Sequence, residues 1–144
     1  MKPEYIIIHH SLTKDNETVS WNAIRNYHIN VQKWSDVGYH YAIELVGDKY
    51  EILKGRMDNE DGAHCLGFND RSIGICLIGN YDHTGPTEAQ LKVLKKLVLS
   101  LMEIYQIPKM CVYGHWETFP MRNKTVEKSC PGNAFSMFSF RKSL

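Results

Sequence analysis

The sequence predicts an α/β fold in which a mixed central β-sheet is flanked by α-helices. Two runs of branched aliphatic residues, at 4–9 and 73–80, have the composition of buried strands. Two longer segments, at 19–33 and 87–107, repeat apolar residues with the spacing of helices that bury one face. Because the elements alternate as strand, helix, hairpin, strand, helix and strand, we expect a sheet covered by helices.

The N-terminal half is expected to form a strand, a helix and a β-hairpin. The first strand is "EYIIIH" at residues 4–9, and the polar loop "SLTKDNET" follows it. Residues 39–46 and 48–56 form two further strands, because the Gly-Asp pair at 47–48 is typical of a hairpin turn. The helix at 19–33 carries its apolar or aromatic side chains on one face: Trp21, Ile24, Tyr27, His28 and Val31.

The C-terminal half is expected to add the central strand, a long helix and a short strand. "IGICLIGN", at 73–80, is the most apolar segment of the chain, which favours a central place in the sheet. Thr87 and Gln90 have the spacing of a capping box, and Pro108 marks where the helix has ended. A short strand follows at 110–115, and the tail from 134 is predicted to be a short helix or an irregular cover.

Length and composition favour one domain spanning residues 1–144. The 144 residues are 43% hydrophobic and 23% charged, with a net charge of +1, so no nucleic-acid or membrane partner is expected and a monomer is the default. The N-terminus, "MKPEYIIIHHSL", has too short an apolar run for a signal peptide. We therefore expect a protein held in the cytoplasm with its four cysteines reduced.

Three groups that follow predicted strands can bind a metal. They are the His9-His10 pair, His115 and Cys130, and imidazole with thiolate is a donor set that suits zinc. Since side chains alternate along a strand, one of the paired histidines should face the site and the other should face away. A chance scatter of polar residues at strand ends, or a cysteine that is a buried thiol or half of a disulfide, is the competing interpretation.

Other polar residues lie near these strand ends and can take part in chemistry or simply in structure. Tyr39 and Tyr41 are expected on one face of a strand and His40 on the other, and a tyrosine hydroxyl can donate to an oxyanion or merely pack in the core. Lys128 can stabilise negative charge or lie exposed. His64 and Asn69 lie in a glycine-punctuated loop of the kind that often binds ligands.

Five motifs together resemble the zinc-dependent N-acetylmuramoyl-L-alanine amidases of the type 2 class. They are "IIIHHS", "DVGYHYAI", "GAHCLGFNDRSIGICLIGNYD", "YGHWE" and "KSCPG", in order from about residue 5 to residue 135. This class contains the short phage lysozyme-like amidases and the peptidoglycan recognition proteins. The segment between the second and third expected zinc ligands, "WETFPMRNKTVEKS", is longer here than in the shortest phage relatives.

The resemblance implies both a fold and a set of residue roles. It implies the mixed sheet of the peptidoglycan recognition protein and type 2 amidase fold, with one Zn²⁺ ion bound by His9, His115 and Cys130. Tyr39 and Lys128 would be catalytic. The loop pair His64 and Asn69 would line the substrate groove.

The implied reaction is hydrolysis of the amide between N-acetylmuramic acid and L-alanine of the stem peptide of bacterial peptidoglycan. A phage or prophage endolysin is the expected biological setting. The expected protein stays cytoplasmic until it is released to the cell wall. Competing functions are a peptidoglycan-binding module that does not cut, a regulator that binds another protein, and a glycosidase, for which no motif suggests the necessary pair of carboxylates.

Overall fold

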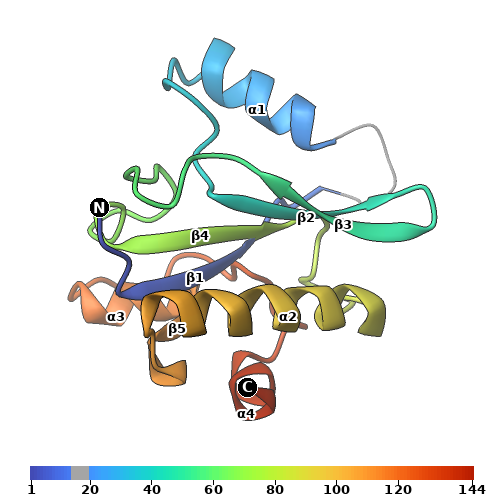
Figure 1. Cartoon of the computed structure of the whole chain (residues 1–144), viewed down its shortest axis with the longest axis vertical. Coiled ribbons are helices and arrows are strands. Elements are labelled where there is room, and N and C mark those ends of the chain that lie inside the picture. The colour runs from blue at the N-terminus through green and yellow to red at the C-terminus, as the bar shows by residue number, and fades with distance from the viewer. Residues whose placement is uncertain (14–19) are drawn as a thin grey trace.

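The computed structural model describes residues 1–13 and 20–144, and these contain one mixed five-stranded sheet (Figure 1). The strand order is β3-β2-β4-β1-β5. All neighbouring strands pair in parallel except the β2-β3 hairpin. The strands are β1 (Tyr5–His10), β2 (Tyr41–Val46), β3 (Lys49–Lys54), β4 (Ser72–Leu77) and β5 (Val112–Gly114). The predicted α/β class and the central position of the most apolar strand are confirmed.

Helices cover the two faces of this sheet. The helix α1 (Trp21–Asn30) lies on one face, and α2 (Glu88–Tyr105) lies along the opposite face with α4 (Met137–Ser143) near it (Figure 1). Two 3₁₀ turns flank β5: η1 (Lys109–Cys111) precedes it and η2 (His115–Glu117) follows it. The short α3 (Thr118–Met121) comes directly after η2. We refer to the two sides of the sheet as the α1 face and the α2 face.

Most of the buried apolar residues lie on the α2 face. Side chains from alternate positions of β1 and β4, such as Ile8 and Ile75, are fully buried there against Leu94 and Val98 of α2. The α1 face holds two smaller apolar clusters, one around Trp21 and Cys76 and the other around Ile7, Cys65 and Phe68. A parallel strand that is buried on both faces is expected to be apolar throughout, as β4 is.

The predicted elements occur with shifted ends. The first strand runs through His10 rather than ending at His9, and the helix predicted at 19–33 is observed at Trp21–Asn30. Residues 14–19, which include most of the predicted polar loop, lie outside the described residues. The hairpin turn at Gly47 is confirmed, with a φ of 66° that glycine adopts without a steric penalty.

One local prediction is wrong and another is confirmed only in part. Tyr39 and Tyr41 do not share one face, because β2 begins only at Tyr41, so Tyr39 packs with the Trp21 cluster and Tyr41 with the α2 face. The capping box at the start of α2 is half formed. The Thr87 hydroxyl accepts a hydrogen bond from the backbone N–H of Gln90, but the Gln90 side chain turns inward and accepts one from the Tyr81 hydroxyl at 2.6 Å.

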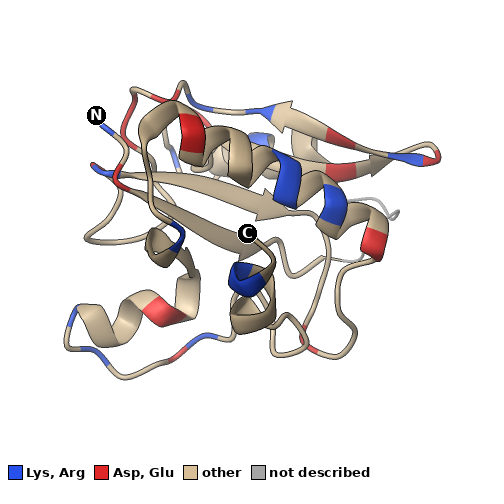
Figure 2. Cartoon of the chain, turned by 60° about the horizontal axis from the view of Figure 1, so that its bottom comes forward, with Lys and Arg blue, Asp and Glu red and all other residues tan. Residues whose placement is uncertain are grey.

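Charges of both signs are mixed over the surface. Figure 2 shows Lys and Arg interspersed with Asp and Glu, with both signs on α2. This pattern matches the net charge of +1. Among the described residues, none of the helices combines the length and the apolar composition needed to cross a bilayer.

Candidate metal centre

Three of the predicted site residues converge at the carboxyl end of the parallel strands. One ligand atom each from His9, His115 and Cys130 lies within 4.8 Å of the other two. The His9 and His115 rings have centroids 4.6 Å apart, and Nδ1 of His9 lies 3.6 Å from Sγ of Cys130. The predicted meeting of these three residues, which are far apart in the sequence, is therefore confirmed as geometry.

His9 and His10 face opposite sides, as the alternation along a strand predicts. His9 is buried on the α1 face, in register with Cys76 of β4. His10 is buried on the α2 face, where its Nδ1 accepts a hydrogen bond from the backbone N–H of Tyr81 at 3.2 Å. Because of this placement, His9 is the member of the pair that belongs to the site.

A partly buried ion pair holds the backbone that carries His115. Glu117 accepts a hydrogen bond from the N–H of Gly114 at 2.8 Å, directly before His115. Both carboxylate oxygens of Glu117 also accept from the Arg141 guanidinium of α4, at 2.6 and 2.7 Å. Arg141 donates further to the carbonyl of Val112 in β5. The C-terminal helix therefore fixes the turn from which His115 projects.

Two backbone hydrogen bonds fix the loop that carries Cys130. The N–H of Trp116 donates to the carbonyl of Cys130 at 2.9 Å, and the N–H of His10 lies 3.4 Å from the Cys130 sulfur as a donor. The peptide bond between Cys130 and Pro131 is cis. These contacts bring the loop against β1 and η2 and direct the thiol toward His9.

The electrostatics of the three residues fit a divalent cation. Burial lowers the pKa of His9 well below its usual value, and burial together with Lys128 lowers the pKa of His115 to about 4, so both imidazoles are neutral at pH 7. Burial raises the pKa of the Cys130 thiol to about 12. The raised pKa means that ionising the buried thiol costs free energy, and a bound zinc ion would offset this cost by stabilising the thiolate. Two histidines with one cysteine is a known catalytic zinc donor set.

Tyr39 lies beside this group. Its ring centroid is 5.2 Å from that of His9. Burial, with the nearby Cys76 and Cys130 thiols, raises the pKa of Tyr39 well above its ordinary value, and a hydrogen bond links its hydroxyl to the Cys76 thiol. The hydroxyl therefore keeps its proton at neutral pH and can act as a hydrogen-bond donor.

Lys128 is exposed, in the loop just before Cys130. Its charge contributes to lowering the pKa of both His9 and His115, after the larger effect of burial. A positive charge that acts on the candidate metal centre favours an anion that forms there.

The two residues predicted to line the substrate groove, His64 and Asn69, are both engaged within the protein. The Asn69 side-chain oxygen accepts from the N–H groups of His64 and Cys65 at 2.9 and 2.8 Å, which holds the loop closed. The Nδ1 of His64 lies 3.0 Å from Nε2 of His9. Their predicted contact with substrate stays a prediction.

Sequence reasoning missed Gly74 and the functional side of Cys76. The ring of His64 lies over Gly74 of β4, where an added Cβ would come within 2.6 Å of the imidazole. Cys76 is the buried core residue predicted, but its thiol also holds the Tyr39 hydroxyl. A glycine inside an otherwise apolar strand marks a close approach, and "SIGICLIG" displays that signal.

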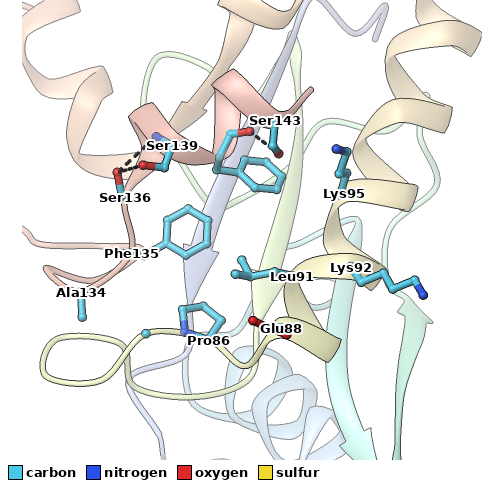
Figure 3. Close-up of a pocket in the computed structure, with 12 residues that line it drawn as sticks. Pro86, Glu88, Leu91, Lys92, Lys95, Ala134, Phe135, Ser136, Ser139 and Ser143 are labelled. Atoms are coloured by element: carbon cyan, nitrogen blue, oxygen red, sulfur yellow. Dashed lines mark hydrogen bonds between the residues drawn. The ribbon is translucent and has the colours of Figure 1, made fainter.

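The structure contains several hollows, and one with a mostly apolar lining is remote from these residues. It lies between α2 and α4, with a volume of about 510 Å³, and its lining includes Leu91 and Lys95 of α2 and Phe135, which precedes α4 (Figure 3). Its lining contains none of the metal-binding residues. A smaller hollow of about 330 Å³ lies beside Tyr39 and is lined by α1 residues such as Ile24 and Tyr27, which places it next to the candidate site.

Two neutral imidazoles, a thiol and a protonated tyrosine at a strand end form the kind of site that metal-dependent hydrolases use. The comparisons with known proteins agree with this class. The sequence matches the family described as N-acetylmuramoyl-L-alanine amidase over residues 1–133. It is 34% identical over 131 residues to the endolysin of Escherichia phage T7, with 88% of this chain and 78% of that protein covered.

Solved structures give the same answer. An endolysin amidase, LysCS, from Clostridium intestinale has a TM-score of 0.79 and 30% identity, covering 99% of this chain and 83% of that one. A mutant of Drosophila PGRP-LB in complex with tracheal cytotoxin has a TM-score of 0.74 and 29% identity, covering 94% and 79%. The chain therefore belongs to the N-acetylmuramoyl-L-alanine amidase family, and the fold and family that the motifs predicted are confirmed.

Proposed function

We propose that this amidase is zinc-dependent and hydrolyses the bond between the lactyl group of N-acetylmuramic acid and L-alanine in peptidoglycan. The observation that carries the proposal is the convergence of His9, His115 and Cys130 within 4.8 Å in a member of this family. A zinc ion bound there would lower the pKa of a water molecule toward about 7 and polarise the scissile carbonyl.

The chain's own residues supply binding and charge stabilisation around that ion. The neutral His9 and His115 present lone pairs, and Cys130 supplies the negative ligand. Lys128 stabilises the oxyanion that forms when the amide carbonyl is attacked, and the protonated Tyr39 hydroxyl donates a hydrogen bond to it. The raised pKa of Tyr39 supports this role as donor, because the group does not ionise at the pH of the reaction.

The hollow beside Tyr39 is a suitable place for the substrate next to the reacting bond. Its walls come from α1 and from the residues after β1, with an apolar lining around Ile24 and polar atoms from Ser11 and Thr13. His64 and Asn69 remain the predicted loop contacts. The likeness to phage endolysins supports action on the bacterial cell wall. That the protein is a monomer held in the cytoplasm until it is released to the wall stays a prediction.

Digestion of purified peptidoglycan tests the proposal directly. We expect new L-alanine amino termini without new reducing sugar ends, and we expect a zinc chelator to abolish their release. Zinc content of the purified protein, measured on the same sample, should be about one ion per chain. Reducing ends would identify a glycosidase, and binding to the wall without either product would identify a recognition module.

A further inference from the structure

We propose that His64 is a positioning residue that fixes the tautomer of His9 and so directs the Nδ1 lone pair of His9 toward the metal. The contact that carries this inference is the 3.0 Å approach of Nδ1 of His64 to Nε2 of His9. The inference deepens the proposed zinc-dependent function. It assigns to His64 a role different from the substrate contact that the motif resemblance implies.

The far side of the His64 ring determines where its proton lies. Nε2 of His64 is 3.4 Å from the backbone carbonyl oxygen of Ser72, and a carbonyl can only accept. The Ser72 hydroxyl lies at the same distance, but it donates its own proton to the carbonyl of Phe68 at 2.7 Å. Both neighbours of Nε2 are therefore acceptors, which places the His64 proton on Nε2.

The position of the proton on the His64 ring in turn determines which nitrogen of the His9 ring is protonated. A neutral imidazole with its proton on Nε2 has a bare Nδ1, which can only accept. Nε2 of His9 must then be the donor in the contact with His64. The remaining nitrogen of His9, Nδ1, keeps its lone pair and lies 3.6 Å from Sγ of Cys130, on the side of the other two ligands.

The His64 ring is held so that it cannot easily leave this position. It lies against two glycines, Gly62 and Gly74, and a Cβ at either one would collide with the imidazole. The backbone N–H of His64 donates to the side-chain oxygen of Asn69 at 2.9 Å, which fixes the backbone that carries the ring. Both ring nitrogens are thus occupied inside the protein, which suits a residue that orients a ligand better than one that reaches for substrate.

The hydrogen bonds from His9 to His64 and from His64 to the Ser72 carbonyl, which we call the relay, also affect the net charge of the candidate metal centre. Metal-bound histidines usually donate their second N–H to a carboxylate, a carbonyl or water. Here a neutral imidazole passes the hydrogen bond on to the Ser72 carbonyl and adds no second negative charge beside the Cys130 thiolate. A divalent ion with one anionic ligand keeps a net positive charge, and a positive centre attracts an oxyanion.

Two substitutions at His64 test the relay. In His64→Asn the side-chain oxygen stands near the position of Nδ1 and can still accept from His9, whereas His64→Leu cannot accept. We expect His64→Leu to weaken zinc binding about 10- to 100-fold, measured by competition with a chromogenic chelator, and His64→Asn to stay within a few-fold of the unchanged protein. Gln90→Leu, a buried polar residue on the α2 face, is the matched control and should leave zinc affinity unchanged.

A measurement on the metal-free protein reports directly which ring nitrogen of His9 and of His64 carries the proton. Nitrogen-15 NMR of the histidine rings should show both His9 and His64 protonated on Nε2, and His9 should lose this preference in His64→Leu. A proton on Nδ1 of His9 in the unchanged protein overturns the inference, as does a folded His64→Leu with unaltered zinc affinity. If His64→Leu does not fold, the tautomers of the unchanged protein decide. Absence of amidase activity would instead refute the proposed function, because the tautomers do not depend on activity.

Discussion

The two faces of the sheet divide stability from chemistry. The α2 face is covered by an 18-residue helix that buries aliphatic side chains against β1 and β4. The α1 face carries smaller apolar clusters, and between them lie buried imidazoles, thiols and Tyr39. Burying polar groups is costly unless they are paired, so a fold can place them on one face only if the other supplies much of the stabilising apolar contact.

His9 and His10 show this difference at a single step along β1. Both are buried, and both have a pKa lowered chiefly by burial. His10 is tied to the backbone of Tyr81, whereas His9 meets His64, His115 and Cys130. The same residue type is therefore bonded to the backbone on one face and is part of the candidate metal centre on the other, because adjacent residues of a strand point to opposite faces.

The largest expected effect comes from removing the negative metal ligand on the α1 face. In Cys130→Ser we expect loss of stoichiometric zinc and amidase activity at background, because the hydroxyl does not ionise as a thiol does. Metal analysis and peptidoglycan digestion measure the two effects. Cys65→Ser, at a buried cysteine on the same face that contacts Thr118 rather than the metal group, should retain both. Full activity in Cys130→Ser would remove the cysteine from the site.

A side-chain truncation on the α2 face should have the opposite result, a loss of stability without a loss of zinc binding. Leu94 is fully buried in α2, and Leu94→Ala should lower the free energy of unfolding by about 2–5 kcal/mol while zinc affinity stays unchanged. Leu99, on the same helix and 39% exposed, provides the control, since Leu99→Ala should change stability by less than about 1 kcal/mol. Urea denaturation of both variants measures this. A Leu94→Ala protein of normal stability but reduced zinc affinity would contradict the division between faces.

Two tyrosines on opposite faces sharpen the comparison. Tyr39→Phe removes only the hydroxyl beside the metal group and should reduce kcat about 10²- to 10³-fold with zinc content unchanged. Tyr41→Phe removes a hydroxyl that donates to Asp58 at 2.9 Å on the α2 face, so it should affect stability and leave kcat near normal. Steady-state hydrolysis of a soluble muropeptide measures both. Equal kcat values for the two variants would exclude Tyr39 as an oxyanion donor.

Replacing Lys128 should reduce kcat as replacing Tyr39 does, but through the loss of a positive charge. Lys128→Ala is expected to reduce kcat by about 10²-fold or more, because a cation near a developing oxyanion is lost. Lys124 lies in the same exposed segment, and Lys124→Ala is the control for a general loss of positive charge. If both variants lose activity equally, the effect belongs to the segment and not to Lys128.

The last prediction is a dependence of stability on pH that originates on the α1 face. Burial lowers the pKa of His64 to about 3 and of His115 to about 4, from 6.5 in the unfolded chain. Below pH 6.5 the unfolded chain therefore binds more protons, and the metal-free protein should lose stability progressively as the pH falls from about 6.5 toward 4. Urea midpoints measured with a chelator present should show this decline. A flat profile over that range would contradict the burial of neutral imidazoles.

Much of the fold was predictable because it depends on local pattern. The apolar run "IGICLIGN" and the hairpin turn at Gly47 each specify their element without distant contacts. The shared face of Tyr39 and Tyr41 was predicted wrongly, because a strand's first residue is set by pairing with β4 rather than by its own sequence. The Gln90 side chain likewise does not cap the helix as predicted. It accepts a hydrogen bond from the Tyr81 hydroxyl, a partner that folding brings close.

The sequence by itself determined the fold class, the family and the residues that are candidates for binding a metal: the His9-His10 pair, His115 and Cys130. Those depend on residue types, on their order and on the positions of strand ends, all of which are written along the chain. Only the tertiary structure decided which of two adjacent histidines faces the site, that Glu117 and Arg141 fix the turn carrying His115, and that His64 lies behind His9. The physical reason is that hydrogen-bond partners and packing surfaces arise between segments far apart in sequence, and no local pattern encodes their final distance.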